Sequence, residues 1–269
     1  MASPSPRRRQ TIHVTKEELD RLYREINTKE FILADPVQFP HRYAPGPDRE
    51  IAAFLAATIA WGRRDLILKS AEKMFALLGS SPHAFIMKGD FKKFENPSTG
   101  RSTGRSIHRT FFEGDLLYFC RGFRACYVKY GSLEALFASA GGIWEGIGLF
   151  RETMASGNSG LCSKHIANPA ADSACKRLNL SLRWLVRREG PVDMGLWKSI
   201  PPSSLFIPLD LHVGRTARSI GLLDRKANDK KAVISLTERL RAFCPEDPVK
   251  YDFALFGASL AMQTKAQGH

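Results

Sequence analysis

The stretch SLFIPLDLHVGRTARSIGL (residues 204–222) places a single aspartate, Asp210, between two unlike segments. An apolar segment that contains Pro208 comes before it, and a basic segment of helical composition follows it as far as Gly221. Aspartate is favoured at helix N-caps, because its side chain accepts hydrogen bonds from backbone N–H groups that the helix leaves unpaired. The stretch predicts a helix after Asp210. At this position the Asp210 carboxylate can cap the helix, take part in chemistry, or do both.

The rest of the chain is also patterned for helices. Apolar residues recur at helical spacing, and no run alternates apolar and polar residues long enough to indicate a strand. Thr15 followed by Glu18 is a capping-box signal, Asp48 and Asp65 are candidate N-caps, and Gly79 is a candidate helix end. The fold class predicted is all-α. Further helices are expected near residues 107–126, 132–139, 175–188, 229–243 and 248–261.

The chain is long enough for one large domain or two small ones. We expect residues 1–14 to form a disordered basic tail and residues 15–269 to form one unit. Within it, a helical subdomain at about 49–160 is inserted between the N-terminal helix and a C-terminal subdomain at about 168–262. The stretch MASGNSGLCS (residues 154–163) is predicted to be a flexible link between them.

Composition indicates a globular protein outside the membrane. Hydrophobic residues make up 43% of the chain and charged residues 25%, which is ordinary for globular domains. The longest nearly apolar run, residues 51–61, is too short to span a bilayer. No apolar core follows the first arginines, so we expect no secretory signal and a cytoplasmic, nucleoid-associated location.

The cysteines and histidines give no metal pattern. The five cysteines are scattered, with no C-x-x-C pair, and none of them has zinc-like spacing to a histidine. We expect reduced, mostly buried thiols, no bound metal and no cofactor. A metal-dependent hydrolase that uses Asp210 and His212 is a distant alternative, because no second histidine lies at ligand spacing.

Positive charge favours a polyanionic partner. The chain has 40 Lys and Arg residues against 27 Asp and Glu residues, a formal net charge of +13. The excess is spread along the chain, and residues 89–106 read as an exposed, glycine-rich basic loop. Cationic side chains that neutralise phosphates release counterions, which drives nucleic-acid binding. We therefore expect a nucleic acid as partner.

The predicted helix from Cys175 carries the second candidate for chemistry. Leu178, Leu182, Leu185 and Val186 fall on one side, and Lys176, Arg183 and Arg187 fall in a narrow stripe on the other. Such a stripe is typical of solvated surface. However, Asp172 and Ser173 are candidate caps, which would place Lys176 in the first turn. There the helix dipole disfavours an extra positive charge and attracts phosphate, so that a neutral, nucleophilic amine is favoured.

Three of these segments together resemble the helix-hairpin-helix DNA glycosylases. IPLDLHVGRTARSIGL is similar to the aspartate-plus-helix segment of that superfamily, and CKRLNLSLRWLV resembles the helix with its nucleophilic lysine. EIAAFLAATIAWGRRDLILKSAEKMFALL resembles its early helix pair, in which an alanine-rich helix leads into a loop facing the lesion. Over most of residues 15–260 the chain looks like an uncharacterised bacterial family with the same three blocks. The long separation from Lys176 to Asp210 resembles the archaeal 8-oxoguanine glycosylase branch.

The resemblance implies a DNA repair glycosylase with lyase activity that acts on a damaged, flipped-out base in double-stranded DNA. Lys176 would attack the sugar C1′ to form a Schiff base, and Asp210 would accept its proton or stabilise the developing charge. Lys198, twelve residues before Asp210, is the competing nucleophile. The expected pocket residues are Trp61, Trp184, Phe206 and His212, and the expected DNA contacts are Arg63, Arg64, Arg177, Arg183, Arg215 and Arg218.

One segment departs from the superfamily. In the superfamily, the hairpin before the lysine normally reads Leu-Pro-Gly-Val-Gly, and the backbone amides of this hairpin hold a DNA phosphate. This chain instead has NPAADSACK (residues 168–176), which contains no glycine. The departure favours the alternative of a non-catalytic DNA- or RNA-binding protein on a degenerate glycosylase scaffold. The presence of both Lys176 and Asp210 favours the enzyme.

Overall fold

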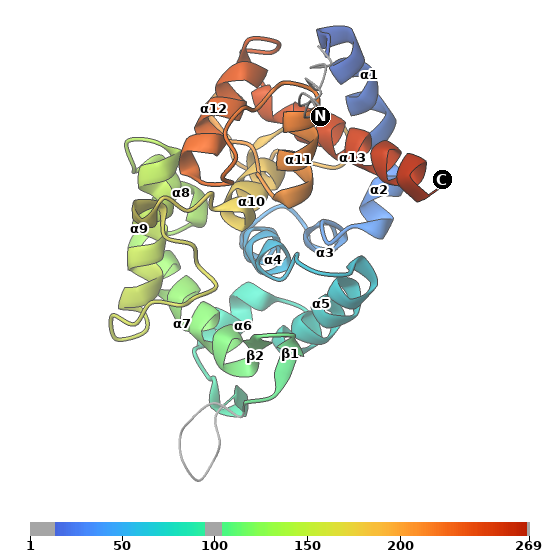
Figure 1. Cartoon of the computed structure of the whole chain (residues 1–269). Coiled ribbons are helices and arrows are strands. Elements are labelled where there is room, and N and C mark those ends of the chain that lie inside the picture. Colours follow the sequence, from blue (N-terminus) through green and yellow to red (C-terminus); the bar gives the residue numbers. More distant parts are fainter. Residues whose placement is uncertain (1–13, 95–103, 268–269) are drawn as a thin grey trace, which may run out of the picture.

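The structure is a computed structural model that describes residues 14–94 and 104–267, with side chains up to residue 261. The predicted tail therefore lies almost wholly outside the described residues, and so does the centre of the predicted basic loop. The described residues are mostly helical, with thirteen α-helices and one two-stranded sheet (Figure 1). The N-terminal half contains α1 (Lys16–Ile26), α2 (Lys29–Ala34), α3 (Gln38–His41), α4 (Pro47–Thr58), α5 (Arg64–Leu78), α6 (Pro82–Lys88), β1 (Ser106–His108), β2 (Phe111–Phe112) and α7 (Glu113–Tyr130). The C-terminal half contains α8 (Leu133–Ala138), α9 (Ile143–Ser156), α10 (Lys176–Val186), α11 (Leu211–Ser219), α12 (Lys230–Arg241) and α13 (Tyr251–Gln267).

The helical prediction is confirmed at the level of the class. The Thr15–Glu18 capping box starts α1, Gly79 ends α5 with φ at 76°, and Asp210 is the N-cap of α11. These signals are local, because each cap acts on backbone groups within four residues of itself.

Two predicted caps are wrong. Gly46 and Arg63 are the N-cap residues of α4 and α5, whereas Asp48 and Asp65 lie inside the first turns. The Asp48 carboxylate instead accepts hydrogen bonds from the Ser81 hydroxyl at 3.0 Å and the His83 backbone N–H at 2.7 Å. It therefore ties the start of α4 to the start of α6, a contact between distant parts of the chain that a local pattern does not reveal.

Several elements were not predicted, among them the short helices α2, α3 and α6, the β1–β2 hairpin and helix α9. The hairpin β1–β2 occupies the start of the helix expected at 107–126, so that α7 begins at Glu113. Helix α9 covers Ile143–Ser156 and takes in the first three residues of the expected flexible link, of which Met154 and Ala155 are buried. Cys120, Cys126 and Cys175 are buried free thiols, as expected of the cysteines.

Helices α4 and α10 form the centre of the molecule. They pack against each other, with α1 and α11–α13 on one side and α5–α7 on the other (Figure 1). Every residue of α4 from Glu50 to Thr58 is buried, so its alanines allow neighbouring helices to approach on all sides. One continuous cluster of buried apolar residues runs through both of these groups of helices.

The buried carboxylate of Glu50 fixes the start of α4. Glu50 accepts hydrogen bonds from the Tyr127 hydroxyl at 2.7 Å, the Trp197 indole N–H at 2.6 Å and the first backbone amides of α8. Burial raises the pKa of Glu50. These bonds join the start of α4 to α7, α8 and the segment after α10. Because its start is fixed, the whole of α4 is held in place beside α10. Within the described ranges, no helix has both the length and the apolar character that crossing a bilayer requires.

Candidate functional site

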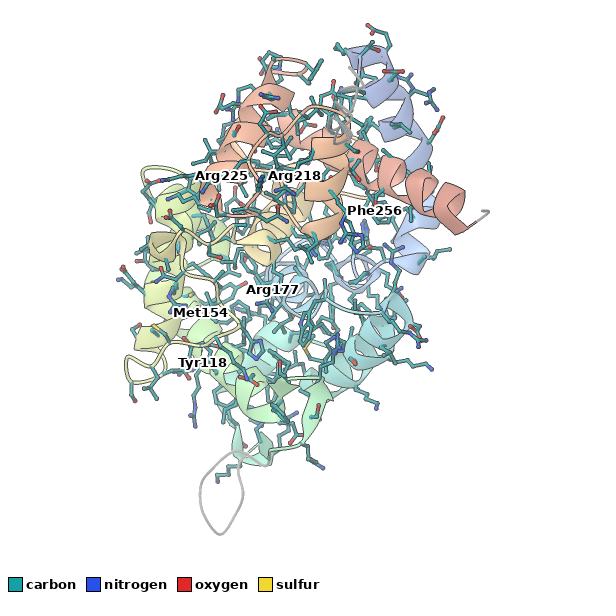
Figure 2. All side chains as sticks on the ribbon, viewed as in Figure 1. Tyr118, Met154, Arg177, Arg218, Arg225 and Phe256 are labelled. Carbon is teal, nitrogen blue, oxygen red and sulfur yellow. The ribbon has the colours of Figure 1, made fainter. Side chains whose placement is uncertain are left out.

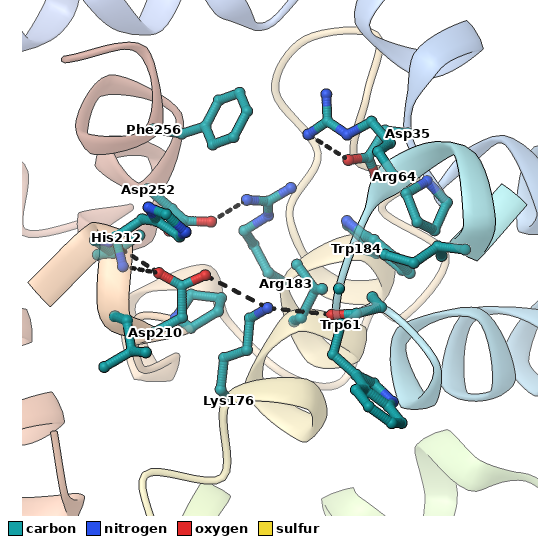
Figure 3. A pocket seen from close by; sticks show the side chains of 18 of the residues that line it. Asp35, Trp61, Arg64, Lys176, Arg183, Trp184, Asp210, His212, Asp252 and Phe256 are labelled. Atoms are coloured by element: carbon teal, nitrogen blue, oxygen red, sulfur yellow. Dashed lines mark hydrogen bonds and ion pairs between the residues drawn. The ribbon is translucent and has the colours of Figure 1, made fainter. Parts of the chain in front are cut away.

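A cavity of about 770 Å³ opens where the starts of α10 and α11 meet the loop after α4 (Figure 3). It is wide enough for a small planar ligand. Its walls carry aromatic rings together with cations and carboxylates, which is the mixture expected of a site that binds a polar ring. The lining includes Phe31, Asp35, Trp61, Arg63, Arg64, Arg109, Lys176, Arg183, Trp184, Asp210, His212, Asp252, Phe253 and Phe256.

Lys176 is the first residue of α10, so the prediction of a first-turn lysine is confirmed. The caps proposed for that helix are wrong. Asp172 and Ser173 lie before the cap position, and the N-cap is Cys175, with φ at 47° and no side-chain cap hydrogen bond. The start of α10 therefore has no side-chain acceptor, and the Lys176 side chain extends from it across the cavity wall.

The Lys176 amine faces Asp210 at the edge of the cavity. Its Nζ lies 3.5 Å from Oδ2 of Asp210 and 3.4 Å from the carbonyl oxygen of Ala60 (Figure 3). The other oxygen of Asp210, Oδ1, accepts hydrogen bonds from the backbone N–H groups of His212 at 2.9 Å and Val213 at 2.8 Å. The same carboxylate therefore caps α11 with one oxygen and pairs with the amine through the other.

This arrangement suits proton transfer. The side chains of Lys176 and Asp210 are 30% and 32% exposed, so a substrate in the cavity can reach both. A carboxylate held by two amides cannot swing away, and it stands next to an amine that must lose a proton to become a nucleophile. The pair supplies the nucleophile and the proton acceptor that an amine-based covalent mechanism needs.

Arg183 is a buried ion-pair partner, which corrects the expectation of a solvated stripe. Its guanidinium donates to Asp252 and, at 3.2 Å, to Asp193. Arg187 is fully buried and pairs with Asp193 and with Asp247. Lys176 stays partly exposed, but the two arginines face carboxylates from later parts of the chain.

Asp252 brings a second carboxylate to the cavity. Burial raises its pKa to about 6, and the nearby charge of Asp210 acts in the same direction, while Arg183 opposes the rise. A carboxyl group with this pKa changes its charge close to neutral pH. The charge of the cavity is therefore sensitive to pH in that range.

The inner end of the cavity is aromatic, and the partly buried Asp35 lies beside it. Nη2 of Arg64 lies 3.5 Å from Oδ2 of Asp35. The Arg64 guanidinium also lies over the rings of Phe31 and Phe256. Burial raises the pKa of Asp35. Trp184 is buried in the wall, and its indole nitrogen has no hydrogen-bond partner among the described residues. These groups give the inner end both stacking surfaces and polar edges.

The mouth of the cavity is built from the loop after α4 and the β1–β2 hairpin. The carbonyl oxygen of Trp61 is 2.9 Å from Nε2 of His108, and the two rings pack edge to face. The guanidinium of Arg109 lies over the Trp61 ring, 5.2 Å from its centroid. Gly62 follows with φ at 97°, and a Cβ there would come within 2.8 Å of Arg109 Nη1. The positive φ, which residues with a side chain rarely adopt, explains a glycine next to the tryptophan.

Several predicted site residues do not line this cavity. Phe206 packs on Trp144, with centroids 5.1 Å apart, so it is a packing residue and not a pocket residue. Arg215 is exposed on α11, and Arg218 holds the following loop through the carbonyl oxygens of Arg225 and Ala227 (Figure 2). The competing Lys198 lies outside the cavity and donates to the carbonyl oxygen of Gly195.

Arg177 lines a neighbouring cavity of about 580 Å³. Its guanidinium donates to the carbonyl oxygen of Thr58 at 2.8 Å. The second cavity shares Ala60, Trp61 and Lys176 with the first, so Lys176 stands on the wall between them. Its lining is mixed, and its polar members include Lys164 and Asn228.

Several residues of the main cavity were not predicted from the sequence, among them Asp35, Arg109, Asp252 and Phe256. Asp252 carried one available signal, since it is an acidic residue within an otherwise apolar helical run. Arg109 carried none, because its position depends on a hairpin too short to have a period. Among the described residues, no group of three or more His, Cys, Asp or Glu side chains is arranged to hold a metal ion.

The chain belongs to a family described as "Protein of unknown function (DUF2400)", whose match covers residues 35–261. The matched region contains both Lys176 and Asp210 and all of the cavity lining except Phe31. A search of curated proteins and a search of solved structures each find no match.

Proposed function

We propose that this member of the DUF2400 family is a DNA base-excision glycosylase with lyase activity, in which Lys176 is the nucleophile and Asp210 is its proton acceptor. The observation that carries the proposal is the Lys176–Asp210 pair, with Nζ and Oδ2 3.5 Å apart at the edge of the cavity. The two residues are 34 positions apart in the chain and come from the starts of two different helices. A surface ion pair would not require a cavity beside it.

The surroundings of the pair fit an extruded base. A flipped nucleotide needs a pocket with aromatic and polar groups and an opening that the DNA backbone can approach. The main cavity has Phe256 and Trp184 at its inner end and Trp61 at its mouth. Arg63 and Arg64 come after Trp61 and Gly62 and also line the cavity. With the formal charge of +13, these arginines favour a polyanionic substrate.

The chemistry follows from the positions of the two groups. Asp210 takes a proton from the Lys176 amine, whose lone pair then attacks the sugar C1′. The bond from C1′ to the base breaks, and its electrons leave with the base, which takes up a proton. Opening of the sugar ring gives a Schiff base, and loss of a C2′ proton then breaks the C3′–O bond and nicks the strand. No step requires a metal or a cofactor.

The segment before Lys176 supports the likeness to the helix-hairpin-helix glycosylases. Asp172 and Cys175 have φ values of 54° and 47°, in the left-handed region that glycine favours. Two non-glycine residues thus adopt glycine-like conformations in the segment where the superfamily carries its glycines. Conformations of this kind cost free energy and tend to persist at functional sites. The assignment of the fold to that superfamily remains part of the proposal.

The test is borohydride trapping. The purified protein would be incubated with duplexes that carry an abasic site, 8-oxoguanine or uracil, and borohydride would reduce any Schiff base to a stable covalent adduct. We expect an adduct with at least one duplex, its loss in Lys176→Ala, and its retention in the control Lys198→Ala. Loss with Lys198→Ala alone would keep the reaction and move the nucleophile.

The second candidate function, a non-catalytic binder of DNA or RNA, is favoured by the glycine-less segment 168–175. It predicts that the wild-type protein and Lys176→Ala bind nucleic acid equally and that neither forms an adduct or releases a base. Binding without an adduct on any of the three duplexes would reject the enzyme and leave this candidate.

A further inference from the structure

Arg109 differs from the other cations that line the main cavity. Lys176 pairs with Asp210, Arg63 with Asp65, Arg64 with Asp35, and Arg183 with Asp193 and Asp252. Among the described residues that line the cavity, Arg109 is the cation for which the structure gives no carboxylate partner. Within the described part of the chain, its positive charge is therefore not paired with a carboxylate.

The backbone holds Arg109 in a costly conformation. Its φ is 50°, in the left-handed region that non-glycine residues avoid. It lies between β1 and β2, and its carbonyl oxygen accepts a hydrogen bond from the Ser106 hydroxyl at 3.0 Å. An asparagine or a glycine would suit this position better. A strained residue at a cavity mouth is a reason to look for function.

The neighbouring residues fit around the Arg109 side chain. The guanidinium lies over Trp61, and Gly62 leaves the space that its Nη1 atom occupies. His108 holds the Trp61 carbonyl oxygen, so the hairpin and the loop after α4 form one unit. The guanidinium lies beside the Trp61 ring and Arg109 is exposed, so its N–H donors can meet a bidentate acceptor at the mouth.

We propose that Arg109 binds a backbone phosphate of the nucleic acid strand at the mouth of the cavity, beside Lys176. The proposal rests on the proposed function, since it takes a polynucleotide as the occupant of the cavity. It assigns Arg109 a binding role and no part in the covalent chemistry. A phosphate at this point would help to set the position of the flipped nucleotide relative to the lysine amine.

The test uses Arg109→Gly and Arg109→Lys in the full chain. Glycine removes the charge and relieves the left-handed strain, so this variant should fold at least as well as the wild-type protein, with an equal or higher melting temperature. Lysine keeps the charge under the same backbone strain. The matched control is Arg42→Ala, because Arg42 is an exposed arginine that also lies over an aromatic ring, that of Phe39, away from the cavity.

The measurement is the salt dependence of binding to a duplex with a tetrahydrofuran abasic analogue, followed by fluorescence anisotropy. Each phosphate contact contributes about 0.9 to the slope of log K against log salt. We expect Arg109→Gly to lower the slope by about 0.9 and to weaken binding several-fold, Arg109→Lys to keep the slope, and Arg42→Ala to match the wild-type protein. A residue that only supports Trp61 would leave the slope unchanged.

An unchanged slope in Arg109→Gly would overturn the proposal, and so would wild-type binding with no salt dependence. These outcomes are separate from those of the trapping experiment, since binding needs no catalysis. A lowered slope with no adduct in the wild-type protein would keep the phosphate contact and reject the Lys176 chemistry. An adduct in the wild-type protein together with an unchanged slope in Arg109→Gly would keep the Lys176 chemistry and reject the phosphate contact.

Discussion

Asp210 uses its two carboxylate oxygens for different partners. Oδ1 accepts from two backbone amides at the start of α11, and Oδ2 faces the amine of Lys176. The local cap signal was readable in the sequence because it acts within three residues. The partnership with Lys176 was not readable in that way, and it entered only through a family resemblance. The roles of Arg183 and Phe206 were misjudged because their partners, Asp252 and Trp144, lie far away in the chain.

Asp210→Asn separates the two roles of this residue. Asparagine is as good an N-cap as aspartate, so we expect the free energy of unfolding to change little, whereas Asp210→Ala should lower it by about 1 kcal/mol. Both variants should lose adduct formation by about 100-fold, because neither accepts a proton from the amine. Chemical denaturation and borohydride trapping measure the two effects. Adduct formation by Asp210→Asn at the wild-type rate would leave Asp210 with capping alone.

Because the pKa of Asp252 is raised, the stability of the protein should depend on pH. Its folded-state pKa is about 6 against an ordinary value of 3.8, so the folded protein holds this proton more tightly than the unfolded chain does. The stabilisation is complete below about pH 4 and is lost as the pH rises through 6. The free energy of unfolding of wild-type protein minus that of Asp252→Asn should therefore fall by about 2 kcal/mol between pH 4.5 and pH 7.5. A difference that stays constant with pH would contradict the raised pKa.

At the scale of elements, the long helices with a clear apolar period were predictable, and elements whose pattern is short or interrupted by glycine were not. Helix α9 was missed because Gly146 and Gly148 lower its helical signal, yet the fold needs at least one of them. A Cβ on Gly146 would lie 2.6 Å from the ring of Phe137. The β1–β2 hairpin was missed because its strands are two and three residues long, too short for an alternating pattern. The mouth of the cavity depends on that hairpin.

Helices α7 and α9 should respond to a single methyl group. A Cβ on Gly122 would lie 2.6 Å from Sδ and 3.1 Å from Cα of Met154. We expect Gly122→Ala to lower the free energy of unfolding by about 1–3 kcal/mol, as overpacking usually does. In the control Gly148→Ala, the Cβ would meet nothing within 4 Å, so this variant should be stabilised by about 0.5–1 kcal/mol. Equal melting temperatures for the two variants would contradict this packing.

At the scale of the whole molecule, a buried ionic cluster joins distant segments behind the cavity. It consists of Arg183, Arg187, Asp193, Asp247 and Asp252, which come from α10, the loop after it, and the start of α13 with the residues before it. The sequence showed the charges but not their pairing. The cluster fixes α10 relative to α13, and with it the position of Lys176 relative to the inner end of the cavity.

Breaking the cluster at its most buried member should be costly. Arg187→Met leaves the carboxylates of Asp193 and Asp247 without their shared partner, and the loss of one partner of a buried pair costs about 3–5 kcal/mol. Arg21→Met removes an exposed pair with Glu25 and should cost less than about 1 kcal/mol. Urea denaturation of the two variants provides the comparison. A loss below about 1 kcal/mol in Arg187→Met would show that the cluster does not hold the fold together.

The identity of the nucleophile is the central claim, and peptide mapping of a trapped adduct tests it most directly. The wild-type protein would be reduced with borohydride on an abasic-site duplex and digested, and the modified peptide would be located by mass spectrometry. The account predicts the added sugar fragment on the side chain of Lys176. A fragment on Lys198, on Lys164 or on the N-terminal amine, or no fragment at all, would contradict it.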